Sequence, residues 1–280
     1  MALSIEDARQ SAATLAWYIR RPALHRELLR RVARRVRSGR ASTTRLRIER
    51  EEATRWCESV RSDLEAVAAR LGVPARPEPL ARLHPVEWQE ALHAVERCPV
   101  QMGGGGHVDL IYHLARHLRP KTVVETGVAY GWSTLAILLA LKENGEGKLF
   151  SMDMPYQSQE SDPWMACVVP ASLREGWTLV RKPDRDALPA LTRDLGTIDF
   201  AHYDSDKAYE GRQFAYGLLY GHLSPGGVMM SDDVDDNVGF RDFARSTGLD
   251  PLVVQRHDGR YVGLLQMPAR TRQRHATLDN

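Results

Sequence analysis

The sequence lacks the features of membrane and secreted proteins. No stretch reaches the roughly 18 apolar residues that a membrane span needs, and the N-terminal MALSIEDARQ carries early acids and no apolar signal core. Its three cysteines are an odd and scattered set, which disfavours a disulfide framework or a zinc cluster: Cys57, Cys98 and Cys167. We therefore expect a cytoplasmic protein with reduced thiols and no membrane partner.

Neither charge sign dominates the whole chain, but the charge is unevenly distributed. The 280 residues are 43% hydrophobic and 26% charged, which is ordinary for a soluble globular protein. Residues 1–50 hold thirteen arginines against four acids, so the remainder carries about −7 when the whole chain has +2. A basic segment can bind nucleic acid, but no nucleic-acid motif accompanies this one. We favour a helical accessory region and expect no nucleic-acid partner.

Residues 1–98 show the apolar spacing of helices. Pro22 begins one segment and Ser38-Gly39 ends it, and a further helix is predicted from about Thr43 to Leu71, closed by Gly72. We expect this region to form a lid or a dimer surface, and hence a homodimer.

After Pro99 short apolar runs alternate with helical patterns. The runs cover residues 122–125, 148–153, 178–181, 198–204 and 227–231, and a final pair, 252–255 and 261–266, is split by the hairpin signal Asp258-Gly259. This alternation predicts an α/β domain over residues 99–270, with a mostly parallel sheet covered by helices on both faces, and a tail over 271–280. Ligands of such sheets bind at the carboxyl ends of the strands.

The first run ends in a glycine turn and the second ends in an acid. Gly127 and Gly131 let a ligand approach the backbone, although an ordinary strand-to-helix turn is the alternative. Their spacing differs from the GxGxxG dinucleotide fingerprint, which disfavours an NAD-dependent oxidoreductase. Asp153 can accept both hydroxyls of a ribose, or else be a cap or surface acid. Together these features favour a ribose-bearing cofactor.

The pattern E-x-G-x-x-x-G-x-S from Glu125 to Ser133 resembles motif I of class I S-adenosylmethionine methyltransferases. It is especially similar to the catechol, caffeoyl-CoA and bacterial sugar and macrolide O-methyltransferases. The resemblance covers about residues 100–267 and implies a Rossmann-like, seven-stranded sheet with S-adenosylmethionine as cofactor. The cofactor-binding residues that it implies are Glu125, Gly127, Gly131, Ser133, Asp153, Asp184 and Arg185.

Acids also end the fourth and fifth runs. Asp204 and the pair Asp232-Asp233 would meet at one edge of the sheet, where unpaired carboxylates repel and raise each other's pKa. A hard divalent cation relieves that repulsion by taking oxygen ligands, whereas helix capping is the alternative role. Metal-dependent O-methyltransferases have acids after the same two strands. We therefore predict Mg²⁺, or another divalent cation, on Asp204, Asp232 and Asp233.

Lys207 follows Asp204 by three residues and is the first candidate for the catalytic base. Metal charge and burial would lower its pKa from about 10.4. Asp206 is the second candidate, and a salt-bridged pair at a helix start is the alternative for both.

Gly103–Gly106 form either a closing lid or a plain linker. An apolar wall for the substrate can come from Trp132, Tyr156, Trp164 and Tyr209.

The combined features predict an S-adenosylmethionine-dependent O-methyltransferase, assisted by Mg²⁺. Its partner would be a small-molecule hydroxyl substrate, namely a sugar, polyketide or phenolic natural product, because metal chelation suits vicinal oxygens. One alternative is a metal-independent N- or O-methyltransferase. Another is a catalytically silent Rossmann-like binding domain whose basic helices bind RNA or a partner protein.

Overall fold

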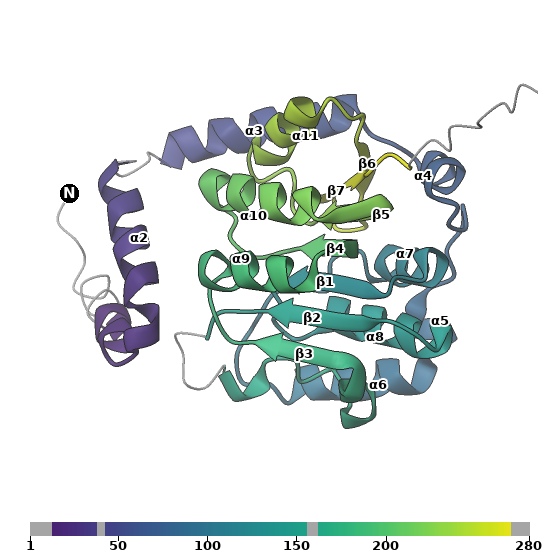
Figure 1. Ribbon diagram of the computed structural model, residues 1–280, viewed down its shortest axis with the longest axis horizontal. Coiled ribbons are helices and arrows are strands. Elements are labelled where there is room, and N and C mark those ends of the chain that lie inside the picture. Colours follow the sequence, from purple (N-terminus) through teal and green to yellow (C-terminus); the bar gives the residue numbers. More distant parts are fainter. Residues whose placement is uncertain (1–12, 38–42, 156–161, 270–280) are drawn as a thin grey trace, which may run out of the picture.

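A seven-stranded sheet forms the centre of the molecule, with the strand order β3-β2-β1-β4-β5-β7-β6 (Figure 1). The computed structural model describes residues 13–37, 43–155 and 162–269, so the expected tail over 271–280 lies outside it. Strand β7 runs antiparallel to both β5 and β6, and the other pairs are parallel. The prediction of a mostly parallel, Rossmann-like sheet is confirmed. The strands are β1 (Thr122–Thr126), β2 (Lys148–Met152), β3 (Trp177–Val180), β4 (Ile198–Tyr203), β5 (Leu223–Ser231), β6 (Leu252–Gln255) and β7 (Tyr261–Gln266).

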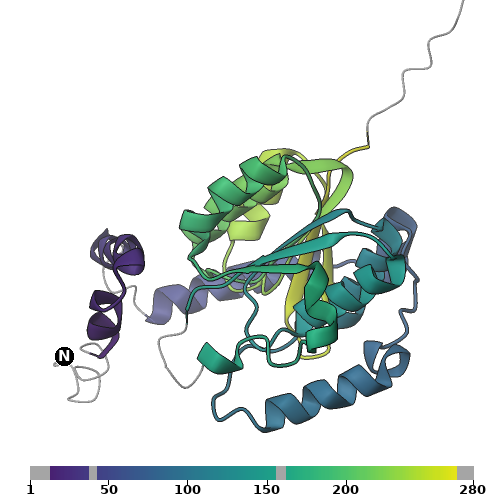
Figure 2. The ribbon, with the colours of Figure 1, turned by 60° about the horizontal axis from the view of Figure 1, so that its bottom comes forward.

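Helices cover both faces of the sheet, as Figure 2 shows. Alternate residues of a strand point to opposite faces, so Val123 of β1 enters one core and Val124 enters the other. The first core takes in α7 (Val108–Leu118) and α8 (Trp132–Asn144). The second takes in α9 (Asp184–Leu195), α10 (Tyr209–Gly221) and α11 (Gly239–Thr247). Two short 3₁₀ turns, η2 (Asp162–Trp164) and η3 (Ala171–Gly176), precede β3.

The N-terminal region is helical, but the single helix expected from about Thr43 to Leu71 is wrong. The structure has two helices there, because the chain pairs with β6 between them: Arg61 forms a bridge with Val253, and the Ser62 N–H donates to the Val253 carbonyl at 2.7 Å. Asp63 then caps the second helix. Residues 13–19 are also helical. The remaining elements are η1 (Pro22–Leu24), α2 (His25–Arg37), α3 (Thr43–Ser59), α4 (Leu64–Leu71), α5 (Leu80–Leu83) and α6 (Pro85–Glu96).

The N-terminal helices differ in the way they contact the sheet, and α3 reaches the second core through Cys57. Side chains of α4, α5 and α6 enter the first core, so that core continues across residue 98: Val67, Leu71, Leu80 and Ala91. Helix α2 stands apart, on the side to which the arrowheads of β2 and β3 point (Figure 1). It is tied to the body by ion pairs, Arg30 with Asp186 and Arg34 with Asp206. Among the described residues, no helix has the length and apolar character that crossing a membrane requires.

The packing of β7 against α11 yields a stability prediction. Gly263 faces the Phe240 ring, and a Cβ there would collide with it. Gly263→Ala should therefore lower the free energy of unfolding by about 1–3 kcal/mol. Gly217, exposed in α10 with open space around its Cα, is the matched control, and Gly217→Ala should raise that free energy by about 0.5–1 kcal/mol. Urea denaturation measures both, and a change of the same sign in the two variants would contradict the packing described.

Candidate active site

A cavity of about 850 Å³ opens at the carboxyl ends of the central strands. Its walls come from the loop after β1, from Asp153 after β2 and from residues that follow β4 and β5. Most of the site residues predicted from the sequence line it: Gly127, Ser133, Asp153, Asp184, Arg185, Asp204, Asp206, Lys207 and Asp233. Three others are buried and are not part of the lining: Glu125, Gly131 and Asp232.

The two loop glycines are required by packing within the protein. Gly127 has φ +81°, and a Cβ there would collide with the backbone carbonyl of Asp204. Gly131 has φ +93°, and its Cβ would press on Ala166 and Val169. The loop therefore passes so close to the end of β4 at Gly127, and to the segment 166–169 at Gly131, that only glycine fits at these two positions.

Glu125 is a buried anchor for the loop. Its carboxylate is fully buried and accepts hydrogen bonds from Ser133 Oγ at 2.6 Å, Thr134 Oγ1 at 2.7 Å and Ser151 Oγ at 2.6 Å. Burial raises the pKa of Glu125 although the three hydroxyl donors and His202 oppose the rise. These bonds join β1, β2 and the start of α8, so Glu125 and the Ser133 hydroxyl hold the loop in shape.

Asp153 also holds the loop, from the cavity side. One carboxylate oxygen, Oδ2, accepts the backbone N–H groups of Val128 at 2.9 Å and Ala129 at 3.1 Å. Ala129 has φ +50°, a conformation that a non-glycine residue adopts only where its surroundings enforce it. The acid after β2 is thus bound to the glycine loop on the wall of the cavity.

Asp184 and Arg185 form the wall at the start of α9. Burial raises the pKa of Asp184 to about 7, a rise that the hydrogen bond from the Ser205 hydroxyl opposes and the charges of Asp206 and Asp153 increase. The Arg185 guanidinium lies 4.5 Å from the centre of the Phe214 ring and donates to the Glu210 carbonyl at 2.8 Å.

The acids after β4 and β5 lie close enough to interact electrostatically. Asp232 is 1% exposed, and its Oδ1 accepts no hydrogen bond from the described residues. Burial raises the pKa of Asp232 to about 8, and the negative charge of Asp204 adds to the rise. Asp233 has φ +52°, a left-handed conformation that Asp tolerates better than most residues. The rise in pKa expected from carboxylate repulsion at this edge of the sheet is therefore present at Asp232.

Lys207 lies between two of these acids. Its Nζ forms ion pairs with Asp204 and, at 2.9 Å, with Asp233 Oδ2. Burial lowers the pKa of Lys207, but the two carboxylates outweigh it and the net pKa is raised. The lowered pKa expected from the sequence required metal charge in addition to burial, and without a metal the two carboxylates determine the direction.

Two further cations reach the acids from the β6–β7 hairpin. Arg256 Nη1 lies 3.3 Å from Asp233 Oδ1 and 3.6 Å from Asp232 Oδ2, and Arg260 Nη2 lies 3.4 Å from Asp233 Oδ1. Burial would raise the pKa of Asp233, but Lys207 and these arginines lower it overall. The sequence reasoning missed both arginines. The available signal was their position on either side of the Asp258-Gly259 turn, in a hairpin that pairs with β5.

Asp206, the second candidate base, is turned toward α2. It forms an ion pair with Arg34 at 2.8 Å and accepts the Ala208 N–H at 3.0 Å. These bonds engage Asp206 at the start of α10, whereas the neighbouring Lys207 is paired with the acids of the cluster.

The donor set of the acidic cluster suits a hard divalent cation. Asp204, Asp232 and Asp233 offer carboxylate oxygens, and the buried Oδ1 of Asp232 lacks a hydrogen-bond donor among the described residues. In this arrangement Lys207 and Arg256 hold those oxygens, and no group of three His, Cys, Asp or Glu within the described ranges gathers as metal ligands. A cation would therefore require Lys207 to release at least one carboxylate.

The glycine run before α7 passes over the acidic cluster. Gly103 and Gly104 line the cavity, and a Cβ on Gly106 would collide with Asp232 Oδ2. Of the aromatic residues expected on the wall, Trp132 packs on Trp88 with ring centres 4.7 Å apart, and Tyr156 lies outside the described residues.

Comparison with known proteins identifies the central part of the chain. Residues 124–234 match a protein-family model described as "Methyltransferase domain". This part of the chain is therefore similar to a methyltransferase domain, and it lies within a sheet of the Rossmann-like methyltransferase fold. The matched residues of this methyltransferase domain include the glycine loop, Asp153 and all three acids of the cluster. No curated protein matches the chain.

Solved structures share the fold of the methyltransferase domain at low sequence identity. An O-methyltransferase from Bacillus cereus in complex with SAH is 16% identical, with a TM-score of 0.52, and the match covers 75% of this chain and 99% of that one. The O-methyltransferase TomG from Streptomyces achromogenes, in complex with SAM, is 17% identical, with a TM-score of 0.51 and coverage of 75% and 98%. A putative caffeoyl-CoA O-methyltransferase from Staphylococcus aureus is 13% identical, with a TM-score of 0.51 and coverage of 67% and 97%.

The raised pKa of Asp184 makes the stability of the methyltransferase domain depend on pH. An unfolded Asp titrates near pH 3.9, so between about pH 4 and 7 the folded state keeps a proton that the unfolded chain has lost. The free energy of unfolding should therefore fall as pH rises through this window, by up to about 1.4 kcal/mol per pH unit. Asp184→Asn should flatten that slope in urea denaturation, and Asp250→Asn, at an exposed acid, should leave it unchanged. An identical slope in wild type and Asp184→Asn would contradict the assignment.

Proposed function

We propose that this methyltransferase is an S-adenosylmethionine-dependent O-methyltransferase that acts on a hydroxyl of a small molecule such as a sugar, polyketide or phenol. The observation that carries the proposal is the place of Lys207. It lies between Asp204 and Asp233, in the same cavity as the glycine loop and Asp153. One cavity thus joins a surface suited to a nucleoside cofactor with a cluster suited to an acceptor hydroxyl.

The glycine loop and the β2 acid support the cofactor part of the proposal. In the reaction, S-adenosylmethionine supplies a methyl group on a positively charged sulfur, and the acceptor oxygen displaces that sulfur in line to give a methyl ether and S-adenosylhomocysteine. Asp153 lines the cavity beside the backbone of Val128 and Ala129, and it would hold the ribose. The carboxylates of the cavity are also a favourable environment for a cationic sulfonium.

The acidic cluster supports activation of the hydroxyl. Asp204, Asp232 and Asp233 would hold Mg²⁺ or another divalent cation, which would lower the pKa of an acceptor hydroxyl. Lys207, once displaced from a carboxylate, would lose the interactions that raise its pKa and would be positioned to take the hydroxyl proton. Asp206 stays the second choice for the base because Arg34 neutralises it.

A metal-independent methyltransferase is the second candidate, and a specific observation favours it. Lys207 and Arg256 already neutralise Asp233, and Arg256 lies near the buried Asp232. In that case the ammonium and guanidinium groups, rather than a metal, would bind the acceptor oxygen and relieve the repulsion among the acids.

A homodimer and a cytoplasmic location stay proposals. The homodimer is supported by α2, where Leu29, Val32 and Val36 follow the spacing of one helical face and are 67%, 51% and 76% exposed. A second copy of the chain packed on this face would remove these apolar side chains from water.

Calorimetry with S-adenosylhomocysteine tests the cofactor assignment. The wild-type chain should bind it, and Asp153→Asn should bind it about tenfold more weakly, because a charge-assisted hydrogen bond to a ribose hydroxyl is lost. Asp250→Asn, at an exposed acid, should bind like wild type. Absence of binding by the wild-type chain would refute the proposed function and favour a silent binding domain.

Metal removal and a lysine variant test the activation of the hydroxyl. With an acceptor found by S-adenosylhomocysteine release, EDTA should abolish turnover and Mg²⁺ should restore it. Lys207→Met should lower kcat by about 10²–10⁴-fold while S-adenosylhomocysteine still binds. Lys142→Met, at an exposed lysine of α8, is the control. Full activity in EDTA would establish the metal-independent alternative, and normal turnover by Lys207→Met would exclude Lys207 as the base.

A further inference from the structure

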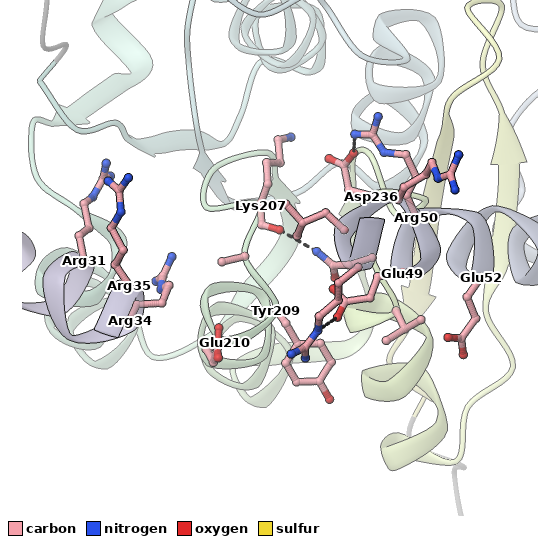
Figure 3. A pocket seen from close by; sticks show the side chains of 16 residues that line it. Arg31, Arg34, Arg35, Glu49, Arg50, Glu52, Lys207, Tyr209, Glu210 and Asp236 are labelled. Atoms are coloured by element: carbon pink, nitrogen blue, oxygen red, sulfur yellow. Dashed lines mark hydrogen bonds and ion pairs between the residues drawn. The ribbon is translucent and has the colours of Figure 1, made fainter. Parts of the chain in front are cut away.

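A second and larger cavity adjoins the proposed active site. It has a volume of about 1430 Å³ and lies between α2, α3 and the start of α10. In Figure 3 the arginines of α2 lie on one side, residues of α3 lie on the other, and Lys207 and Tyr209 lie between them. We name it the arginine groove, after the six arginines that line it: Arg31, Arg34, Arg35, Arg45, Arg47 and Arg50.

The arginine groove and the first cavity share two lining residues. Arg31 and Lys207 line both of them, so a molecule that fills the groove reaches Lys207 at one end. The groove also lies beyond the acidic cluster, away from the glycine loop and Asp153. Its position is therefore that of an acceptor subsite rather than a cofactor subsite.

Positive charge exceeds negative charge in the groove. The six arginines and Lys207 face four acids, namely Glu49, Glu52, Glu210 and Asp236. Most of these cations already form ion pairs, namely Arg31 with Glu27 at 2.8 Å, Arg34 with Asp206 at 2.8 Å, Arg45 with Glu49 at 2.9 Å, Arg47 with Glu51 at 3.6 Å, Arg50 with Asp236, and Lys207 with Asp204 and Asp233. Arg35 is exposed and forms no ion pair with any described residue, so its guanidinium is available to a ligand.

The groove also offers an apolar surface between the charged walls. Tyr209 is 41% exposed and its hydroxyl lies 3.2 Å from Asp242 Oδ2, an interaction that holds the side chain. Leu46 and Val238 lie on the same lining. Such a surface suits the packing of a planar or ring-shaped group.

We propose that the arginine groove binds the anionic part of the methyl acceptor, which is a small hydroxylated molecule carrying a phosphate or carboxylate group. The planar guanidinium groups donate paired hydrogen bonds that match both oxyanions. The anion lies among the arginines of α2 and α3, the ring packs on Tyr209, and the hydroxyl to be methylated lies at Lys207. This inference rests on the proposed function and adds the charge of the acceptor to it.

A nucleic acid fits these features less well than a small anion. A polyanion gains affinity from a continuous basic surface, whereas the groove is interrupted by four acids and ends at Lys207. Binding of a short RNA is accordingly one of the outcomes that would overturn the proposal.

Calorimetry with inorganic pyrophosphate tests the groove without a known acceptor. Pyrophosphate should bind the full chain saturated with S-adenosylhomocysteine, because the two sites are separate. Arg35→Glu should weaken pyrophosphate binding about tenfold and leave S-adenosylhomocysteine binding unchanged. Arg193→Glu reverses an arginine of α9 that is 74% exposed and lies outside the groove, and it should have no effect.

A matched set of acceptors distinguishes the two anions. Catechol, its carboxylate derivative protocatechuate, and a catechol with a phosphomonoester side chain are compared by S-adenosylhomocysteine release. Arg35→Glu should raise KM about tenfold for the charged acceptor that the groove prefers, with kcat and the KM for catechol unchanged.

The outcomes separate this inference from the proposed function. If S-adenosylhomocysteine binds but pyrophosphate does not, or if Arg35→Glu binds pyrophosphate as tightly as wild type, the groove does not bind the anion. A short RNA that binds more tightly than pyrophosphate, with strong salt dependence, would also overturn the inference. Failure of S-adenosylhomocysteine to bind would instead refute the proposed function.

Discussion

The balance of charge around Asp204, Asp232 and Asp233 governs the arrangement of the active site. Three carboxylates at adjacent strand ends repel one another, and the most buried of them, Asp232, has its pKa raised to about 8. Lys207 from the β4–α10 loop and Arg256 from the β6–β7 hairpin form ion pairs with these acids and reduce the repulsion. Lys207 is also the proposed base. Its protonation state therefore depends on whether Lys207 itself, an arginine or a metal would neutralise the three acids.

A second constraint is the shape of the loop after β1. On the buried side of the loop, Glu125 accepts hydrogen bonds from three hydroxyl groups. On the cavity side, Asp153 accepts hydrogen bonds from two backbone N–H groups of the loop. The loop must also clear the carbonyl of Asp204, which leaves room only for glycine at position 127. The same contact brings the glycine loop next to Asp204. The backbone therefore fixes the distance between the proposed cofactor site and the acidic cluster.

Sequence patterns predicted the elements of the domain well where the signal is local. Strands β6 and β7 have the bounds that periodicity and the Asp258-Gly259 turn indicate, and the acids lie at the strand ends as expected. The prediction was wrong for the helix from Thr43 to Leu71, because its interruption depends on pairing with Val253 of β6. A contact between residues nearly two hundred positions apart leaves no periodic signal in either segment.

The sequence by itself determined the alternation of strands and helices in the α/β domain and placed one acid after β2, one after β4 and two after β5, because strand and helix periodicities are properties of neighbouring residues. Only the tertiary structure decided which cations reach those acids, which hydroxyl groups surround Glu125, and that α2 and α3 enclose an arginine groove beside Lys207. These features depend on the distances between side chains from separate elements, such as Arg34 with Asp206 or Arg256 with Asp233. Electrostatic energy depends on those distances in space, and separation along the chain does not specify them.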